Sequence, residues 1–423
     1  MDFETIDQQS SWHVVIVGGG FAGLKCAMEL ASHDNVQITL IDKHNYQQFK
    51  PLLYQVATSI LSTENAAFAL RDLLRNFPNV DVQMDEVISV DMERRSVTTA
   101  AGNTFAGDFL VLATGAHVNF FGTPGAQQYA LPLYSLTDAE KLRSAILKTL
   151  EAADRNPQDT TPSSLNFVIV GGGPTGVEMA GTLSDTLHQL LQSEFRHVPP
   201  ARAQVFLIER GAAVLADFST ASQAYAKSAL EQHLVQLRLG VAVKEVTANA
   251  VLLSDGSQIP AKTVIWAAGL RANDVHSKAP VAQSPNGRLD VQPDLTLRGF
   301  DDVYALGDLA NATGPDGKSL PQLASVAQQA GKHCARNIIA AIQGEPTTPF
   351  VYSDRGILAM IGRNAAIAEL GKSHHEITGP LAFAAWLGVH ATLLTTVRAK
   401  LEAVIEWGWE YHAGVHAGQL IDR

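Results

Sequence analysis

Residues 13–23 read HVVIVGGGFAG, and this stretch determines the fold expected for the chain. The apolar residues 14–17 predict a buried strand, residues 18–23 form a G-x-G-x-x-G turn, and residues 24–30 predict a helix. In such a turn the first glycine allows the tight bend, the second lets the backbone approach a pyrophosphate, and the third lets helix and strand pack closely. The helix start presents unpaired N–H groups to the phosphates. The stretch therefore predicts a dinucleotide site.

An acid follows the second predicted strand, residues 36–41. Asp42 lies a little over 20 residues beyond the glycines, where a carboxylate accepts hydrogen bonds from the hydroxyls of an adenosine ribose. The next stretch, residues 43–58, is almost uncharged and fits neither helical nor strand periodicity. It is either a buried connection or a wall of a flavin or substrate pocket.

The same pattern recurs in the middle of the chain. Residues 166–170 predict a strand, residues 171–176 read GGGPTG, and a helix follows. Glu209 ends the next predicted strand, and a carboxylate there bonds a ribose 2′-hydroxyl and repels a 2′-phosphate, which predicts NADH over NADPH. Arg210 weakens this prediction, since an arginine can bind a 2′-phosphate. Two such units in one chain argue strongly against a chance match.

Glu178 lies two residues past the last glycine of the second turn. It either stabilises the first turn of its helix by interacting with the helix dipole, or it places a carboxylate near a nicotinamide. Farther along, Asp308 follows a predicted strand and either bonds a ribityl hydroxyl or caps the next helix. Position alone favours the helix-dipole interpretation of Glu178, and it leaves both roles of Asp308 open.

Composition narrows the classes of function. The 423 residues suffice for two or three domains, and the net charge of −11 without a basic tract argues against nucleic acid as a partner. The polar, acidic N-terminus is unlike a signal or transit peptide. Two distant cysteines, Cys26 and Cys334, fit a reducing compartment and small buried side chains. No spacing indicates a metal site, because His374-His375 lacks a third ligand.

The tail from residue 350 predicts strands and then one or two amphipathic helices. About 21 residues between Glu376 and Arg398 are uncharged, which is long enough for a membrane span. Pro380, Gly388 and His390 interrupt this segment, so we do not predict a span. The aromatic side chains favour a membrane interface: Trp386, Trp407, Trp409 and Tyr411. A packed helix pair or a homodimer contact is the alternative.

The whole chain resembles the type II NADH:quinone oxidoreductases, which belong to the flavoproteins with two dinucleotide-binding domains. The resemblance rests on both glycine turns with Asp42, on two small-residue turns at 113–115 and 305–308, and on motifs specific to the narrower family. These motifs are FKPLLYQVAT (49–58), ATGAHVNFFGTPG (113–125), MIGR (360–363) and WGWEY (407–411).

The resemblance implies an α/β fold with two Rossmann-like domains and a C-terminal membrane-associating helical segment. The FAD domain would comprise residues 1–122 and 290–345, the NADH domain 123–289, and the C-terminal domain 346–423. The tail would bind the cytoplasmic face of the inner (cell) membrane as a peripheral, monotopic anchor. The enzyme would serve the respiratory chain without pumping protons.

The resemblance also implies the site residues. For FAD these are Gly18, Gly20, Phe21, Ala22, Gly23, Asp42, Lys43, Val87, Thr114, Gly115, Asp308 and Ala324. For NADH they are Gly171, Gly173, Gly176 and Glu209. Glu178 would act beside the nicotinamide and flavin. The quinone would meet Gln55, Ser325, Gln328 and Gln329. Family members often have Ala-Gln where this chain has Ala324-Ser325, which leaves the quinone contacts less defined than the NADH contacts.

The implied reaction passes a hydride from NADH to FAD and two electrons from FAD to a quinone. The alternatives are a soluble flavin reductase for a ferredoxin-like protein and a non-enzymatic flavoprotein that senses NADH. A sulfide:quinone reductase is disfavoured, because such an enzyme needs a working cysteine pair.

Overall fold

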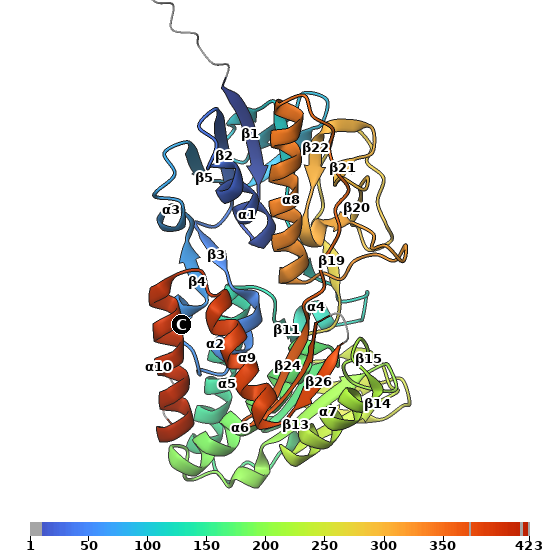
Figure 1. Ribbon diagram of the computed structural model, residues 1–423. Coiled ribbons are helices and arrows are strands. Elements are labelled where there is room, and N and C mark those ends of the chain that lie inside the picture. The colour runs from blue at the N-terminus through green and yellow to red at the C-terminus, as the bar shows by residue number, and fades with distance from the viewer. Residues whose placement is uncertain (1–10, 372–373, 415–417, 422–423) are drawn as a thin grey trace, which may run out of the picture. The chain divides into compact units, whose positions relative to one another are not determined.

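The protein is described here by a computed structural model covering residues 11–371, 374–414 and 418–421. The chain forms two compact units (Figure 1). Unit 1 comprises residues 1–47, 68–117 and 270–353, and unit 2 comprises residues 48–67, 118–269 and 354–423.

Unit 1 is built on a six-stranded sheet in the order β21-β22-β9-β1-β2-β5. All of its pairings are parallel except β21 with β22. The strands are β1 (Trp12–Val17), β2 (Val36–Asp42), β5 (Val80–Met84), β9 (Phe109–Leu112), β21 (Thr296–Leu297) and β22 (Phe300–Ala305). The chain goes from β1 to β2 on one side and later returns to β9 on the other. Ligands bind such sheets at this switch point, outside the carboxyl ends of the strands.

Two helices of unit 1 lie side by side in Figure 1, α1 (Phe21–Leu30) and α8 (Ala324–Ile342). Their close approach requires Gly331, because a Cβ there would lie 2.2 Å from the carbonyl oxygen of Ala22. Cys26 and Cys334 are both fully buried between apolar side chains of this unit, as small core residues are expected to be. The unit also contains an antiparallel sheet, β6 (Val87–Asp91), β7 (Ser96–Thr99) and β8 (Thr104–Ala106), and the pair β20 (Leu289–Asp290) and β23 (Ala310–Asn311).

Unit 2 repeats the design with a five-stranded parallel sheet in the order β11-β18-β12-β13-β14. The strands are β11 (Ala130–Pro132), β12 (Asn166–Val170), β13 (Gln204–Glu209), β14 (Val235–Leu239) and β18 (Thr263–Trp266). The main helices are α5 (Leu136–Arg155), α6 (Pro174–Ser193) and α7 (Thr220–Gln232). A smaller antiparallel sheet follows, with β15 (Val243–Val246), β16 (Ala250–Leu253) and β17 (Gln258–Pro260). The predicted repeat of the strand, turn and helix is confirmed at β12 and α6.

The tail of unit 2 forms the sheet β24 (Gly356–Gly362), β25 (Ala365–Leu370) and β26 (His375–Thr378), followed by α9 (Pro380–Leu393) and α10 (Val397–Ala413). Helix α9 packs on β25, and α10 packs on α9 and on the short helix η2 (Thr63–Asn65). Among the described residues, none of the helices combines the length and apolar character that a membrane crossing needs.

The remaining elements are short. They are β3 (Tyr46–Gln48), β4 (Ala67–Ala69), β10 (Ala116–Val118), β19 (Leu270–Ala272), α2 (Leu53–Ala57), α3 (Leu70–Leu73), α4 (Ala126–Tyr129), η1 (Lys50–Leu52), η3 (Pro162–Ser164), η4 (Pro200–Arg202) and η5 (Gly307–Leu309).

The two units differ from the predicted domain boundaries. Residues 48–67 belong to unit 2 because α2 packs on α5 and α6, and the tail from residue 354 belongs there because β24 packs on α6. Residues 270–289 belong to unit 1. The tail is therefore part of the unit that carries the second glycine turn, whereas a separate C-terminal domain was expected.

Candidate functional site

Two positions of the first glycine turn can be occupied only by glycine. Gly18 has a φ of +105°, and a Cβ there would lie 2.3 Å from the Ala113 carbonyl oxygen. A Cβ on Gly23 would lie 1.9 Å from the Gly18 carbonyl oxygen. Gly20 is different, since no described atom lies within 4 Å of a Cβ built there. Its backbone therefore faces open space at the start of α1, as a phosphate cradle requires.

Asp42 is bonded to the backbone of this turn. Its Oδ2 accepts from the Gly19 N–H at 2.6 Å, and its Oδ1 accepts from the His44 N–H at 2.7 Å. A carboxylate has further lone pairs available, so this bracing leaves acceptor capacity for ribose hydroxyls. The sequence predicted the ribose contact but gave no sign of the link to Gly19. The neighbouring Lys43 is exposed.

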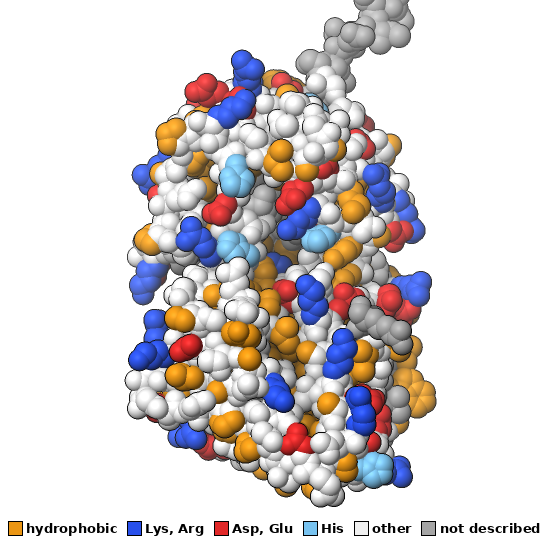
Figure 2. All heavy atoms as spheres, turned by 180° about the vertical axis from the view of Figure 1, so that it is seen from behind, with side chains coloured by type: hydrophobic (Ala, Val, Ile, Leu, Met, Phe, Trp, Pro, Cys, Tyr) orange, Lys and Arg blue, Asp and Glu red, His pale blue; other side chains and the backbone are white. Residues whose placement is uncertain are grey.

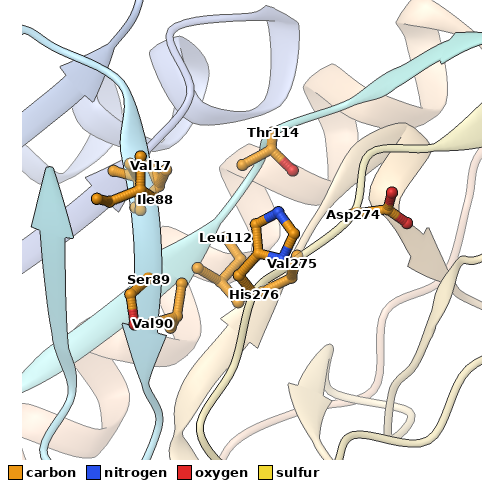
Figure 3. Close-up of a pocket in the computed structure, with 10 residues that line it drawn as sticks. Val17, Ile88, Ser89, Val90, Leu112, Thr114, Asp274, Val275 and His276 are labelled. Atoms are coloured by element: carbon orange, nitrogen blue, oxygen red, sulfur yellow. The ribbon is translucent and has the colours of Figure 1, made fainter. Parts of the chain in front are cut away.

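A pocket of unit 1 opens at the carboxyl ends of β1 and β9 (Figure 3). Its lining includes Val87, together with Val17 and Thr114 at the strand ends and His276 on the facing loop. The Thr114 hydroxyl is buried and has no hydrogen-bond partner among the described residues. The Thr114 carbonyl oxygen, in contrast, accepts from Asn273 at 2.7 Å. A buried hydroxyl without a partner beside an open cradle fits a polar ligand.

Gly307 positions Asp308 in the same unit. With a φ of +64°, Gly307 lies against Ala22 of α1 and Ala327 of α8, so Asp308 sits in the η5 turn beside both helices. The buried Arg288 is close enough to respond to Asp308: burial lowers the pKa of Arg288, and the Asp308 charge opposes this shift. Phe21 and Ala22 form the first turn of α1, and Gly115, with a φ of +75°, follows Thr114.

The first residues of α8 carry three of the four expected quinone contacts. The Ser325 hydroxyl is bonded to the Tyr352 hydroxyl at 2.9 Å. Gln329 makes two bonds with the backbone of Ser353, at 3.0 and 2.9 Å. Gln328 and Ala324 are half-buried. These residues lie in unit 1, whereas Gln55 lies in unit 2.

The second glycine turn reproduces the first in detail. Gly171 has a φ of +110°, and a Cβ on Gly176 would lie 1.8 Å from the Gly171 carbonyl oxygen. Gly173, like Gly20, faces open space, with no described atom within 4 Å of its Cβ position. Glu209 mirrors Asp42, since its Oε2 accepts from the Gly172 N–H at 2.7 Å and its Oε1 from the Gly211 N–H at 2.5 Å. The chain therefore contains two equivalent cradles, one in each unit.

Glu178 is held on α6 by the tail of its own unit. A Cβ on Gly181, one turn later, would overlap the Ile361 carbonyl oxygen, so β24 runs directly against the helix there. This contact brings the Met360 N–H to Glu178 Oε1 at 3.2 Å, and the Trp386 Nε1–H reaches the same oxygen at 3.2 Å. Glu178 is buried, with 8% of its surface exposed. The sequence did not indicate either of these partners.

Burial raises the pKa of Glu178 to about 8, and the bonds from Met360 and Trp386 oppose the shift. The carboxyl is therefore mostly protonated near neutral pH. Because both N–H donors meet on Oε1, the proton is carried on Oε2. Next to it, burial lowers the pKa of His390 to about 4, and this neutral imidazole stacks on Trp386 with ring centroids 3.8 Å apart.

The raised pKa of Glu178 predicts a pH-dependent stability. Between about pH 4.5 and 8 the folded protein keeps a proton that the unfolded chain releases, so the free energy of unfolding falls by about 1.4 kcal/mol per pH unit and levels off above pH 8. Glu178→Gln does not titrate and accepts the same two bonds. Thermal unfolding is expected to show the variant gaining stability over the natural protein from about pH 5 to about pH 9. An equal difference at every pH would contradict this.

Tyr54 and Gln55 of α2 lie in the same buried region. Gln55 donates to the Tyr54 hydroxyl at 3.0 Å, and Trp407 of α10 donates to Gln55 at 2.7 Å. Trp386 and Trp407 were expected at a membrane interface, but they are 0% and 7% exposed. That expectation is wrong for both, because their indoles fill the space between the tail helices and α2 and find hydrogen-bond partners there. Trp409, in contrast, is 61% exposed.

Comparisons with known proteins agree with the presence of two dinucleotide-binding turns in this chain. The sequence model of the pyridine nucleotide-disulphide oxidoreductase family matches residues 12–331. The type II NADH:quinone oxidoreductase Ndh of Mycobacterium tuberculosis is 34% identical over 409 residues, which cover 93% of this chain and 87% of that protein. NdhA of the same organism, also a type II NADH:quinone oxidoreductase, is 34% identical over 426 residues, covering 96% and 88%.

The fold has a close counterpart among solved structures. NDH2 of Plasmodium falciparum in complex with NADH superposes with a TM-score of 0.88 at 19% identity, covering 98% of this chain and 100% of that one. At this identity the likeness establishes the α/β fold of the whole chain.

Proposed function

The chain belongs to the type II NADH:quinone oxidoreductases, within the pyridine nucleotide-disulphide oxidoreductase family, and on this premise we propose that it transfers electrons from NADH through FAD to a membrane quinone. The observation that carries the proposal is the pair of equivalent cradles, each with an open glycine and a carboxylate bonded to the turn. With two dinucleotide sites, one chain can bind both the electron donor, NADH, and a resident electron acceptor, FAD. FAD, when bound, accepts a hydride and returns two electrons.

FAD is assigned to unit 1. The open backbone at Gly20 and the start of α1 would hold its pyrophosphate, with Gly18 and Gly23 shaping the turn. Asp42 would accept from the ribose and Asp308 would meet the ribityl chain. The unpartnered Thr114 hydroxyl supports a polar contact with the cofactor, and Val87, in the lining of the neighbouring pocket, is assigned a further contact. The other assigned contacts are Phe21, Ala22, Lys43, Gly115 and Ala324.

NADH is assigned to the second cradle, with its pyrophosphate at Gly173 and its ribose at Glu209. Both Glu209 oxygens already accept backbone N–H bonds, so the side chain is held in place. A fixed negative charge there repels a 2′-phosphate, which supports NADH over NADPH. Arg210 is exposed beside it.

Glu178 is assigned to the catalytic site beside the nicotinamide and flavin, as the resemblance implies, where it would hold a proton. Its Oε2 carries a proton in a buried setting, and quinone reduction consumes two protons along with two electrons. For the quinone, Gln55 is the candidate contact in unit 2, and Ser325, Gln328 and Gln329 are the candidates in unit 1. In place of the glutamine common in the family, Ser325 presents a hydroxyl already bonded to Tyr352.

The outer face of α10 supports binding to a membrane surface. Five large apolar side chains are exposed along it at helical spacing: Val397 (73%), Leu401 (61%), Val404 (52%), Ile405 (57%) and Trp409 (61%). A continuous exposed apolar stripe is unusual on a soluble surface and suits an interfacial helix. On the face drawn in Figure 2, acidic and basic side chains are interspersed. We assign the stripe to the cytoplasmic face of the inner membrane.

Introducing negative charge on the stripe tests this assignment. Leu401→Asp combined with Ile405→Asp removes two apolar side chains from the bilayer contact and is expected to weaken binding to phosphatidylcholine vesicles by more than about tenfold in a flotation assay. Val351→Asp, an exposed apolar position in unit 1, serves as the control. Undiminished flotation of the double variant would contradict the assignment. A second copy of the chain is the alternative occupant, and it would appear as a dimer that does not float with lipid.

Steady-state oxidation of NADH and NADPH with a short-chain quinone tests the proposed function. The purified protein is expected to be yellow and to oxidise NADH faster than NADPH. No quinone-dependent rate with either nucleotide, or turnover only with a ferredoxin-like protein, would refute the function. A preference for NADPH would refute the role of Glu209.

A further inference from the structure

A chain of three hydrogen bonds runs from α10 into α2 and β24. Trp407 Nε1–H donates to Gln55 Oε1 at 2.7 Å, Gln55 Nε2–H donates to Tyr54 Oη at 3.0 Å, and Tyr54 Oη–H donates to Met360 Sδ at 3.2 Å. Tyr54 and Gln55 are each 2% exposed, so water does not compete for these groups. The four residues come from the segments FKPLLYQVAT, MIGR and WGWEY, which are far apart in the sequence.

The chemistry of the first donor, an indole N–H, determines the direction of all three hydrogen bonds. An indole N–H only donates, so the carbonyl oxygen of Gln55 must face Trp407. The amide N–H₂ of Gln55 must then face Tyr54, whose oxygen accepts. The single proton of the Tyr54 hydroxyl is therefore directed away from Gln55. It reaches a thioether sulfur, which is a weak acceptor.

Trp407 is itself held firmly. Its indole is 7% exposed and meets Trp386 edge-on, with ring centroids 6.1 Å apart. The preceding residue, Glu406, accepts from both the backbone N–H and the hydroxyl of Ser62 at 3.0 Å each. Two neighbouring residues of α10 thus fasten the helix to the segment around α2.

We infer that Trp407 is a positioning residue for quinone reduction: its indole N–H orients Gln55 so that the Tyr54 hydroxyl is presented as a donor to the quinone carbonyl. This inference rests on the proposed function. A carbonyl oxygen is a better acceptor than the Met360 sulfur, and it gains negative charge as electrons arrive, so a donor aimed at it stabilises the reduced state. Without the indole N–H, the Gln55 amide is free to turn its oxygen to Tyr54 and capture that proton.

Trp407→Phe tests the inference, because it keeps an aromatic ring and removes the N–H. The expected result is a fall of about tenfold in kcat/KM for a short-chain benzoquinone, the effect of one lost hydrogen bond, with an unchanged rate of flavin bleaching by NADH in anaerobic stopped flow. Tyr54→Phe is expected to give the same fall. The double variant is expected to fall no further, since both changes remove the same donor. Trp12→Phe, in β1 of unit 1, is the matched indole-to-phenyl control.

The outcomes separate this inference from the proposed function. Absence of quinone reduction by the natural protein refutes the function. If the natural protein reduces quinone, a Trp407→Phe variant within twofold of it refutes the inference, and so does an equal loss in both half-reactions or full additivity with Tyr54→Phe. Should Trp407→Phe fail to retain FAD, Tyr54→Phe alone replaces it, because it removes the same hydroxyl donor and keeps the aromatic ring. The same two expectations then apply.

Discussion

Gly20→Ala is expected to give a folded chain without bound FAD and without activity. A Cβ at this position meets no described atom within 4 Å, so it does not disturb the turn, but it projects into the space that a pyrophosphate would fill. Alanine in place of glycine at the start of α1 costs about 1 kcal/mol at most. Flavin absorbance of the purified protein should fall to below about a tenth of the natural value.

Two other glycines serve as controls. Gly388→Ala, within α9 and also without a described neighbour inside 4 Å, should retain FAD. Gly23→Ala should lose FAD for a different reason, because its Cβ would lie 1.9 Å from the Gly18 carbonyl oxygen and unit 1 would be strongly destabilised. Thermal unfolding of FAD-free samples separates the two cases. A Gly20→Ala protein that retains its yellow colour would contradict the FAD assignment.

Gly173→Ala is expected to retain FAD while losing NADH. The Cβ position is open here as at Gly20, so the second cradle would keep its shape with a methyl group in the place of the NADH pyrophosphate. The KM for NADH should rise by more than about tenfold, corresponding to at least about 1.4 kcal/mol of lost binding. Flavin in the variant should still be reduced by dithionite and reoxidised by quinone, because those steps do not use this cradle.

Gly176→Ala is the contrasting change. Its Cβ would lie 1.8 Å from the Gly171 carbonyl oxygen, so α6 could not stay against β12, and unit 2 should lose stability rather than affinity alone. A Gly173→Ala protein that oxidises NADH with an unchanged KM would contradict the assignment of NADH to this cradle.

The glycine turns could be predicted because their requirements are local. The strand, the turn and the helix are consecutive in the sequence, and the conformations of Gly18 and Gly171, with φ above +100°, admit no other residue readily. The acids at the ends of the following strands were placed by their distance from the turns. Their bonds to Gly19 and Gly172 depend on strand pairing and were not predictable from spacing.

The buried cluster of unit 2 could not be predicted, because its members are brought together from distant segments. Gln55 and Trp407 are separated by 352 positions, and Glu178 and Trp386 by 208. Helical periodicity placed Trp386 and Trp407 on an apolar face, but it did not indicate what that face covers. On α10 the apolar residues occupy two faces, so Trp407 is buried while Trp409, two positions later, is exposed. The neutral state of Glu178 likewise follows from burial by the tail.

An anaerobic double-mixing experiment tests the central claim most directly. The yellow protein is first mixed with one equivalent of NADH and then with a short-chain quinone, while the flavin absorbance is followed. The two-cradle account predicts that NADH bleaches the flavin and that the quinone restores its colour, with both steps at least as fast as steady-state turnover. Flavin that NADH reduces but quinone does not reoxidise, or that NADH does not reduce, would contradict the account.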